Sequence, residues 1–260
     1  MKENFLHVGY HKTGTSWMQK FMFPTIFKGE YFGKSFESED HWGKKDWKFL
    51  DTIAKGETGL LSNEWIMKQN PNIYNIACDI KSRLTCKNTK IIISIRNQKE
   101  LMLSRFMHLS SSRFKMWDLD LNSCLFKPSG SKKSRRYLSE RLYWYYNFAE
   151  TYKIFINEFG KSNVHIIIYE NLFENTECEI KRFLNFTNKD ISESDKELIF
   201  NSSTIKENEK KFDERVKLWE SMDDNIKKTI LLKIENRYEE SNKQMSELIG
   251  FDLRKYGYHK

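Results

Sequence analysis

The isoleucine-rich segment Lys90–Arg96, with the sequence KIIISIR, most constrains what this chain can fold into. Four of its seven residues are isoleucine, and a nearly continuous β-branched run is typical of a strand that is buried on both faces. Shorter apolar runs occur at Phe5–Tyr10, Gly59–Ser62 and Val164–Tyr169. Because both faces of a parallel sheet are normally covered, these segments predict the strands of a parallel sheet.

Helical patterns separate these strands through the first 170 residues, and further helical patterns follow. This alternation predicts an α/β protein with a P-loop-like three-layer fold, in which a central parallel β-sheet is flanked by helices. Ligands of such sheets bind beyond the carboxyl ends of the strands. The other predicted elements are a short strand within Gly29–Phe36 and helices at 15–27, Trp42–Lys55, Ile73–Leu84, Lys99–Leu109, Tyr137–Phe159, Glu177–Phe186, within Asp213–Glu240 and at Ser241–Leu248.

Length and charge bound the organisation of the chain. Its 260 residues, 39% of them hydrophobic, suit one large domain over residues 1–260. The irregular region 110–136 is predicted to be a long surface loop or lid. The net charge of +8 fits an anionic partner, such as a phosphorylated cofactor, an acidic polysaccharide, nucleic acid or an acidic membrane surface. It fits a solvated lysine-rich surface equally well.

Cysteine usage and hydropathy argue against several classes of protein. The four cysteines show no CxxC spacing, so neither a zinc site nor a disulfide framework is indicated. No secretory signal pattern precedes the first strand, and no run of about 18 apolar residues occurs. We therefore expect a cytoplasmic protein without a transmembrane segment.

The segment after the first strand, Lys12–Trp17 with the sequence KTGTSW, has the composition of an anion-binding loop. It offers one cation, three hydroxyl groups and the backbone N–H groups at the start of a helix, where the helix dipole favours an anion. The Walker pattern GxxxxGK[ST] does not match, because Lys12 precedes Gly14 instead of following it. An ordinary capped turn would also explain this segment taken alone.

A second anion-binding element follows the isoleucine-rich strand. Arg96 ends that strand, where an arginine is well placed to hold a phosphate through bidentate hydrogen bonds. Ser104 lies in the next predicted helix and meets the same anion only if the anion lies along that helix. Taken alone, Arg96 is more often a surface charge or the partner in a salt bridge.

Together these motifs resemble the sulfotransferases that use 3′-phosphoadenosine 5′-phosphosulfate (PAPS) as the sulfuryl donor. KTGTSW is similar to the family's 5′-phosphosulfate loop. IRNQKELMLSRF, which contains Arg96 and Ser104, is similar to its 3′-phosphate motif and has the same spacing. VHIIIYENL and the ending IGFDLRKYGY resemble further segments of the family, the latter in bacterial members. The resemblance spans nearly the whole chain and implies a bacterial enzyme similar to carbohydrate sulfotransferases.

The resemblance also implies roles at the PAPS site. Lys12 would bind the phosphosulfate group and stabilise charge on the leaving phosphate oxygen. Arg96 and Ser104 would hold the 3′-phosphate, and the product would be adenosine 3′,5′-bisphosphate (PAP). Trp17 would stack on adenine, although a core tryptophan fits its position as well. No metal is implied. The amide and hydroxyl groups around the phosphosulfate would come from Thr13, Gly14, Thr15 and Ser16.

The acceptor hydroxyl needs a general base. Small-molecule members of the family use a histidine in a THL-like segment, and the corresponding region Ile73–Asn88 contains no histidine. Several carbohydrate sulfotransferases use a glutamate instead, and Glu64 in LLSNEW is the candidate here. A helix cap or a salt bridge to lysine is the alternative role of Glu64. His11, which is also a candidate catalytic residue, and His108 are the fallback bases.

Cations beside aromatic residues make region 110–136 the expected acceptor wall, with Arg113, Lys132 and Arg136 as predicted substrate-binding residues. Such a surface suits an acidic sugar, so a glycan or glycolipid is the first expected acceptor and a small phenol or alcohol the second. A solvated loop would explain the same residues. Some of these cations would bind the 3′-phosphate instead, because the family's C-terminal RKG element is absent.

Two other functions fit parts of the sequence. A nucleotide or small-molecule kinase would use a similar strand–loop–helix unit, but its lysine should follow the second glycine. A non-enzymatic basic nucleic-acid-binding domain would explain the charge but leaves both cofactor motifs unexplained. The sequence therefore favours a sulfotransferase that does not bind nucleic acid, and it does not identify the acceptor or the oligomeric state.

Overall fold

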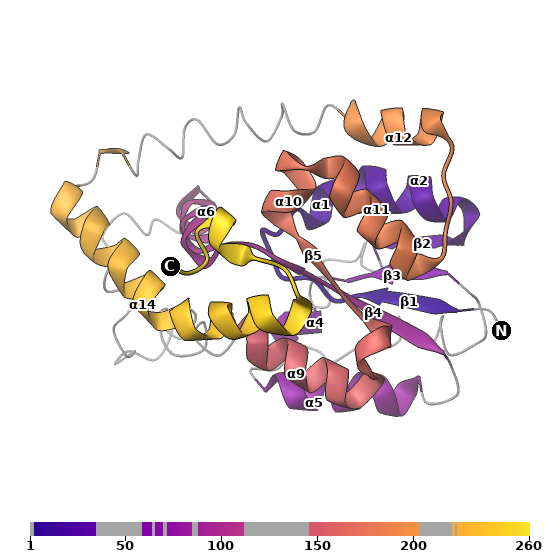
Figure 1. Ribbon diagram of the computed structural model, residues 1–260, viewed down its shortest axis with the longest axis horizontal. Helices are drawn as coiled ribbons and strands as arrows, with labels where there is room; N and C mark the ends of the chain where they lie inside the picture. The colour runs from indigo at the N-terminus through magenta and orange to yellow at the C-terminus, as the bar shows by residue number, and fades with distance from the viewer. Residues whose placement is uncertain are drawn as a thin grey trace. The chain divides into compact units, whose positions relative to one another are not determined.

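The computed structural model describes residues 3–34, 59–63, 66–69, 72–84, 88–111, 146–202, 220–221 and 223–260. The strands in these ranges are β1 (Asn4–His7), β2 (Tyr31–Lys34), β3 (Leu60–Ser62), β4 (Thr89–Ile95) and β5 (Val164–Ile168). They form one sheet in the order β2-β3-β1-β4-β5 (Figure 1). Every pair of neighbouring strands runs parallel, which confirms the predicted parallel sheet.

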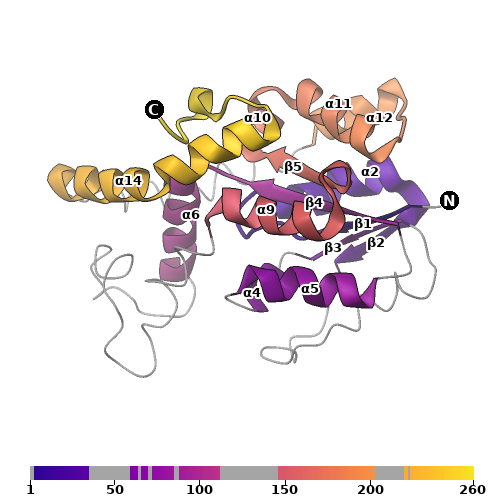
Figure 2. The same ribbon diagram turned by 60° about the horizontal axis from the view of Figure 1, so that its bottom comes forward.

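Helices form most of the remaining described structure. They are α1 (Thr15–Trp17), η1 (Met18–Met22), α2 (Phe23–Phe27), η2 (Lys28–Glu30), α4 (Ile66–Gln69), α5 (Ile73–Arg83), α6 (Gln98–Ser111), α9 (Phe148–Phe159), η4 (Lys161–Asn163), α10 (Tyr169–Glu174), α11 (Thr176–Thr187), α12 (Glu193–Phe200), α14 (Asp224–Ile249) and η5 (Leu253–Tyr256). Helices α2, α10 and α11 lie on one face of the sheet, and α5 and α9 lie on the other (Figures 1 and 2). The predicted three-layer fold is therefore confirmed.

Burial of the strands explains their composition. Every residue of β1 and β3 is buried, and in β4 only Lys90 is partly exposed. Ile92 and Ile167 belong to the same buried cluster as Phe23 on α2 and Phe183 on α11. The β-branched side chains of the central strands thus form one side of an aromatic core, whose burial is the main stabilising contribution to the fold.

The register of the sheet brings three strand ends to one edge. His7, the last residue of β1, lies opposite Ser62 on β3 and Ile92 on β4. The N–H group of Asn63, just after β3, donates a hydrogen bond of 2.9 Å to the carbonyl of His7. The segments that follow β1, β3 and β4 therefore leave the sheet at its carboxyl edge, where a ligand of a parallel sheet is expected.

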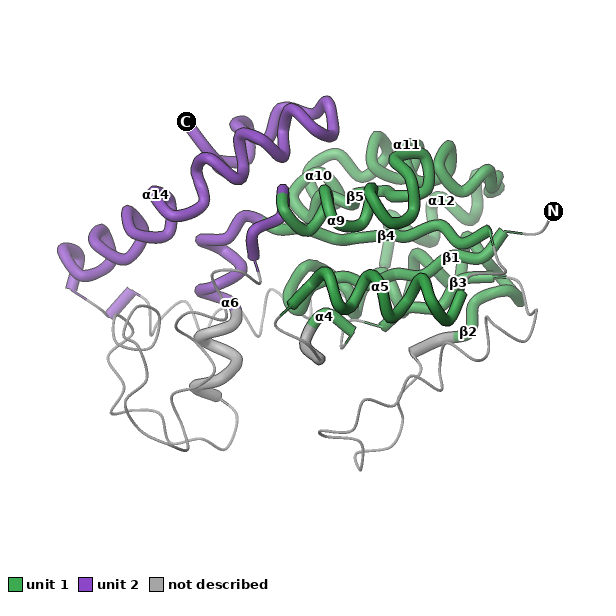
Figure 3. Tube along the Cα trace, turned by 90° about the horizontal axis from the view of Figure 1, so that it is seen from below, with its two compact units in different colours: residues 1–96, 150–202 green, residues 97–149, 203–260 purple. Residues whose placement is uncertain are grey.

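The chain divides into two compact units (Figure 3). Unit 1 comprises Met1–Arg96 and Glu150–Ser202, and unit 2 comprises Asn97–Ala149 and Ser203–Lys260. Unit 1 contains the whole sheet. The expectation of a single domain over residues 1–260 stays a prediction.

Unit 2 is organised by contacts between α6, α14 and the C-terminal segment. Gln98 at the start of α6 and Asn242 on α14 exchange two amide hydrogen bonds of 2.8 and 2.9 Å. Asn242 also donates a hydrogen bond of 2.7 Å to the carbonyl of Tyr258. Both amides are buried, so this reciprocal pair satisfies polar groups that would otherwise be costly in the interior.

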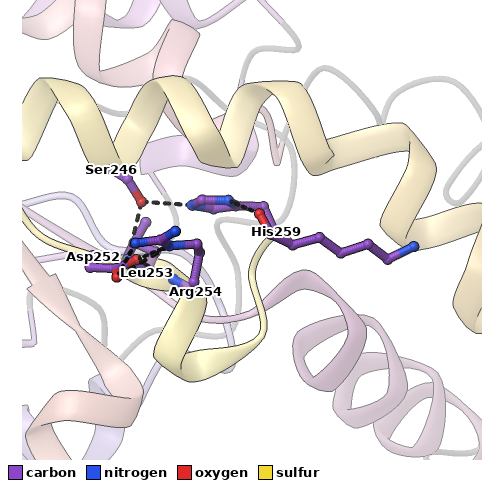
Figure 4. Close-up of polar contacts among 6 residues, drawn as sticks. Ser246, Asp252, Leu253, Arg254 and His259 are labelled. Carbon is purple, nitrogen blue, oxygen red and sulfur yellow. Dashed lines mark hydrogen bonds and ion pairs between the residues drawn. The ribbon is translucent and has the colours of Figure 1, made fainter.

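A second set of polar contacts attaches the C-terminal segment to α14 (Figure 4). The hydroxyl of Ser246 lies 3.0 Å from Nε2 of His259 and accepts a hydrogen bond of 3.1 Å from the N–H group of Leu253. Asp252 pairs with Arg254 at 2.8 Å. These contacts hold the last residues in place beside α14.

Two of the predicted helices have other bounds in the structure, and further helices appear. The predicted helices within 213–240 and at 241–248 are one continuous helix, α14, because Ser241 lies within it and its hydroxyl bonds to the side chain of Asn147 (2.7 Å). The described part of the predicted helix 137–159 begins only at Phe148, because Tyr146 lies in a turn. Helices α10 and α12 were not predicted.

Several predictions fall on residues outside the described ranges, namely helix 42–55 and most of region 110–136. The N-terminal end of that region, Ser110 and Ser111, belongs to α6. None of the described helices is both long enough and apolar enough to span a membrane.

A partly buried histidine on β5 makes the stability of this fold sensitive to acid. The His165 ring stacks on Phe186, with ring centroids 4.9 Å apart, and meets the edge of Phe183 at 5.8 Å. Burial, reinforced by the positive charge of Arg182, lowers the pKa of His165 from 6.5 to about 3. The folded protein therefore holds this imidazole neutral.

We predict that His165→Phe makes the free energy of unfolding less sensitive to acid. Between pH 6.5 and about 3 the unfolded chain binds a proton that folded His165 does not, so stability falls as the pH falls. Removing the imidazole should reduce this slope by up to about 1.4 kcal/mol per pH unit. Urea unfolding at several pH values within this range measures the slope, and equal slopes for variant and wild type would contradict the prediction.

Candidate active site

The chain leaves β1 through a turn that needs left-handed backbone at two positions. Lys12 has φ 68° and Gly14 has φ 78°. Gly14 is also the N-cap of the helix that begins at Thr15. The first N–H groups of a helix have no acceptor within the helix, and a glycine N-cap has no side chain to offer them. The loop therefore presents backbone N–H groups in the way that anion sites use.

Two of the three predicted hydroxyl ligands hold the loop together. Thr13 donates a hydrogen bond of 2.5 Å to the carbonyl of Tyr10, and Thr15 donates one of 3.2 Å to the same oxygen. Both threonine side chains are buried, whereas Ser16 is exposed. In this arrangement the backbone N–H groups, rather than the threonine hydroxyls, are oriented to serve an anion.

Arg96 contacts this loop directly. Its Nη1 donates a hydrogen bond of 3.2 Å to the carbonyl of Lys12, and only 8% of the arginine is exposed. The guanidinium carbon lies 4.2 Å from the ring centroid of Tyr169, the first residue of α10, which is a cation–π geometry. The structure thus brings together Lys12 and Arg96, the two cations that the sequence assigned to separate phosphate motifs.

Tyr169 packs on the loop as well as on Arg96. A Cβ atom placed on Gly14 would lie 3.1 and 3.3 Å from two carbons of the Tyr169 ring and 3.4 Å from the Phe173 ring. Gly14 is therefore required both by its positive φ and by the close approach of α10. Sequence reasoning gave Tyr169 no role at the site. The YENL segment directly after a buried strand was the available signal.

Glu179 fixes the junction from which Tyr169 projects. Its buried carboxylate accepts hydrogen bonds from the side chains of Asn171 and Arg182 at 2.5 and 2.6 Å and from the N–H group of Ile168 at 3.4 Å. Burial raises the pKa of Glu179, and the charge of Arg182 acts in the opposite direction. The carboxylate thus ties the end of β5 and the first turn of α10 to α11.

Trp17 lies in the core of unit 1. It is 2% exposed, its indole N–H donates a hydrogen bond of 2.5 Å to the hydroxyl of Ser202, and its ring meets the edge of Phe173 at 5.4 Å. This is the core position that the sequence left open as an alternative, and stacking on adenine stays a prediction. Ser104 lies on α6 in unit 2 with its side chain buried, and its contact with the 3′-phosphate likewise stays a prediction.

The other predicted site residues are described only in part. His11 is half-buried beside Lys12. Glu64 lies outside the described residues, as do Arg113, Lys132 and Arg136, and of His108 only the helical backbone is described. In the described ranges no group of three or more His, Cys, Asp or Glu side chains is arranged to hold a metal ion.

A buried histidine beneath the loop was not identified from the sequence. His7 lies within hydrogen-bond distance of the hydroxyls of Ser62 and Ser94, at 2.8 and 3.2 Å. Burial lowers the pKa of His7 to about 3, so the imidazole is neutral in the folded protein. The signal was a histidine within an otherwise apolar strand, five residues before Lys12.

We predict that Gly14→Ala destabilises the protein more than Gly250→Ala does. Both glycines have positive φ, but a Cβ atom on Gly250 would meet nothing within 4 Å. Each variant should lose about 1–2 kcal/mol from left-handed backbone strain, and Gly14→Ala should lose more because Tyr169 must move. Urea unfolding measures both losses, and equal losses would show that the Tyr169 contact does not matter.

Comparisons with known proteins agree with this geometry. Residues 2–239 match the model of the sulfotransferase domain family. A crystal structure of a sulfotransferase from Alicyclobacillus acidocaldarius has a TM-score of 0.59 at 17% identity, covering 98% of this chain and 99% of that one. Mouse sulfotransferase SULT7A1 complexed with PAP has a TM-score of 0.50 at 19% identity, covering 78% of this chain and 64% of that one. Both structures support the fold.

A sequence relative points to the same family. The 3-alpha-hydroxysteroid sulfotransferase of Cavia porcellus is 22% identical over 217 residues, which cover 80% of this chain and 67% of that protein. The family assignment itself rests on the family model, which covers most of the chain. This protein therefore belongs to the sulfotransferase family and is a transferase enzyme.

Proposed function

We propose that the protein transfers the sulfuryl group of PAPS to a hydroxyl group of an acceptor. The observation that carries this proposal is the hydrogen bond from Arg96 to the carbonyl of Lys12. It joins a lysine-containing loop at a helix start to an arginine at a strand end, as a nucleotide with phosphates at both 3′ and 5′ positions requires. Membership of the family supports the reaction, and the PAP complex of the mouse protein supports the choice of nucleotide.

The proposed roles follow from the chemistry of the groups present. The side chain of Lys12 and the N–H groups from Gly14 onwards would hold the phosphosulfate, and Arg96, with Ser104, would hold the 3′-phosphate. Negative charge builds up on the leaving phosphate oxygen as the S–O bond to it breaks. Positioned cations and N–H groups stabilise that charge and lower the barrier. The acceptor oxygen attacks sulfur in line, and PAP leaves.

We assign the general base to Glu64, with His11 and His108 as the alternatives. Glu64 directly follows Asn63, whose N–H group is bonded to the carbonyl of His7 at the carboxyl edge of the sheet. A base must reach the proton of the attacking hydroxyl at that edge. The proton of the acceptor would pass to Glu64 as the new O–S bond forms.

The proposed acceptor is a glycan or glycolipid, bound through Arg113, Lys132 and Arg136. Support comes from the cations and aromatic residues of region 110–136. A small phenol or alcohol is the second candidate acceptor, and the name of the Cavia porcellus relative, a 3-alpha-hydroxysteroid sulfotransferase, supports the alcohol. Turnover with labelled PAPS and a panel of saccharides, phenols and sterols distinguishes the two classes.

We predict that Lys12→Ala abolishes sulfuryl transfer, whereas Lys20→Ala does not. Lys20 is exposed, and its ammonium lies over the Phe21 ring at 5.0 Å, so this control removes an equal charge nearby. Transfer from labelled PAPS is the measurement, and full activity of Lys12→Ala would overturn the assignment of its role.

Calorimetry should show that wild type binds PAP. Binding of ATP–magnesium in preference to PAP would favour a kinase, and strongly salt-dependent nucleic-acid binding without PAP binding would favour the basic-domain alternative.

We predict that Glu64→Gln retains affinity for PAP but loses turnover by about 10²- to 10⁴-fold, which is the usual contribution of a general base. The amide keeps the size of the side chain but cannot accept the proton. Steady-state kinetics and PAP titration separate the two effects. Matched His11→Gln and His108→Gln variants should retain turnover, and the opposite pattern would move the role of base to the affected histidine.

A further inference from the structure

We propose that His7 is a positioning residue for Lys12, acting through one directed line of hydrogen bonds that links helix η1 and the strands β3, β1 and β4 to the loop. The proposal rests on the proposed function only for the role of Lys12. The chain of contacts is a property of unit 1, in which all its members lie.

The contacts form an unbroken line from helix η1 to the loop. Five side chains take part, and the line ends on a backbone carbonyl. In order they are Gln19 Nε2 to Ser62 Oγ (2.9 Å), Ser62 Oγ to His7 Nδ1 (2.8 Å), His7 Nε2 to Ser94 Oγ (3.2 Å), Ser94 Oγ to Thr13 Oγ1 (2.6 Å) and Thr13 Oγ1 to the carbonyl of Tyr10 (2.5 Å).

The two ends of this line fix the direction of every hydrogen bond. A carbonyl oxygen only accepts, so Thr13 gives its single hydroxyl proton to Tyr10 and must accept from Ser94. Ser94 has then used its own proton and must accept from Nε2–H of His7. At the other end the amide of Gln19 donates to Ser62, which leaves the hydroxyl of Ser62 to donate to Nδ1 of the imidazole.

His7 on β1 connects the two halves of the line, because it accepts a hydrogen bond from Ser62 on β3 and donates one to Ser94 on β4. Its ring must donate at Nε2 and accept at Nδ1 at the same time, which only one neutral tautomer does. The ring is fully buried and meets the edge of Phe23, with centroids 5.1 Å apart. Burial lowers the pKa of His7 to about 3, so the imidazole stays neutral.

The backbone beside this contact is adapted to it. A Cβ atom on Gly9 would overlap the hydroxyl of Ser94 and the imidazole of His7. Gly9 does not have positive φ, so a glycine is needed here for space and not for backbone conformation. The absence of a side chain at residue 9 is therefore what allows His7 to reach Ser94.

The last hydrogen bond of this line sets the backbone geometry of Lys12, the residue proposed to contact the donor. The bond from Thr13 to Tyr10 closes a turn that contains only His11 and Lys12. Lys12 sits in this turn with φ 68°, a conformation that side-chain-bearing residues adopt only when their surroundings hold them there. His7, through Ser94 and Thr13, thus anchors the turn to β4, one strand away.

The test compares His7→Leu, Ser94→Ala, their double variant and Gly9→Ala with His165→Phe. The last is a matched control, since His165 is another histidine of the sheet, partly buried and with a pKa lowered to about 3, but takes no part in this line of hydrogen bonds. Hydrogen–deuterium exchange of the backbone over residues 8–17 reports on the turn without any ligand. Turnover of PAPS, corrected for the folded fraction, reports on Lys12.

We expect faster exchange over residues 8–17 in the first four variants and not in His165→Phe. Their kcat should fall by about 10- to 100-fold, as displacement of a catalytic group by an ångström can cause, with a smaller change in the KM for PAPS. The kcat of the double variant should be no lower than that of the more impaired single variant, because His7→Leu and Ser94→Ala each interrupt the same line of hydrogen bonds.

Unchanged exchange over the turn together with normal kcat per folded molecule would overturn the proposal and leave His7 as an ordinary core residue. Additive losses in the double variant would also overturn it. If wild type neither binds PAP nor turns over PAPS, the proposed function fails instead. The exchange data alone then decide whether His7 holds the turn. Should His7→Leu not fold, Ser94→Ala breaks the same line while removing only a hydroxyl.

Discussion

The hydrogen bond from Arg96 to the carbonyl of Lys12 is the contact on which the rest of the candidate site depends. Lys12 has left-handed backbone, which for a residue with a side chain is stable only if neighbouring groups impose it. Arg96 fixes the peptide that follows Lys12, and the guanidinium of Arg96 packs on the ring of Tyr169. Lys12 and Arg96, the two cations of the proposed nucleotide site, are therefore held in one assembly within unit 1.

Buried hydroxyl groups support this assembly from below. Thr13 and Thr15 both direct their protons to one carbonyl, so they shape the loop and leave its N–H groups to serve a ligand. Hydrogen bonds of this kind are strong in a low-dielectric interior and costly to leave incomplete. A loop fixed in this way has little reorganisation to undergo when charge develops on a leaving group, which is the condition for electrostatic catalysis.

Local sequence patterns predicted the sheet and the position of the loop, since burial on both faces selects β-branched runs such as Lys90–Arg96. They did not predict that the threonine side chains turn back to the carbonyl of Tyr10, because that depends on the backbone of the folded turn. Nor did they predict the packing of Tyr169 on Gly14, because those residues are more than 150 positions apart in the sequence. Helix α12 had a usable signal, the capping box of Ser192 and Asp195. The predicted helix boundary at Ser241 is wrong, because a serine whose hydroxyl bonds to a side chain outside the helix, here Asn147, does not interrupt the helix.

The reversed order of lysine and glycine relative to the Walker pattern has a structural consequence. In this chain the helix begins at Thr15, so Lys12 precedes the helix and lies in the turn itself. A lysine within a helix would be positioned by the helix backbone. Lys12 is instead positioned by the sheet, through Arg96 at the end of β4 and through the line of hydrogen bonds from His7 on β1. Its placement is then set by side-chain chemistry on the two central strands, so the buried hydroxyl and imidazole groups of the line from His7 should affect transfer without touching the donor.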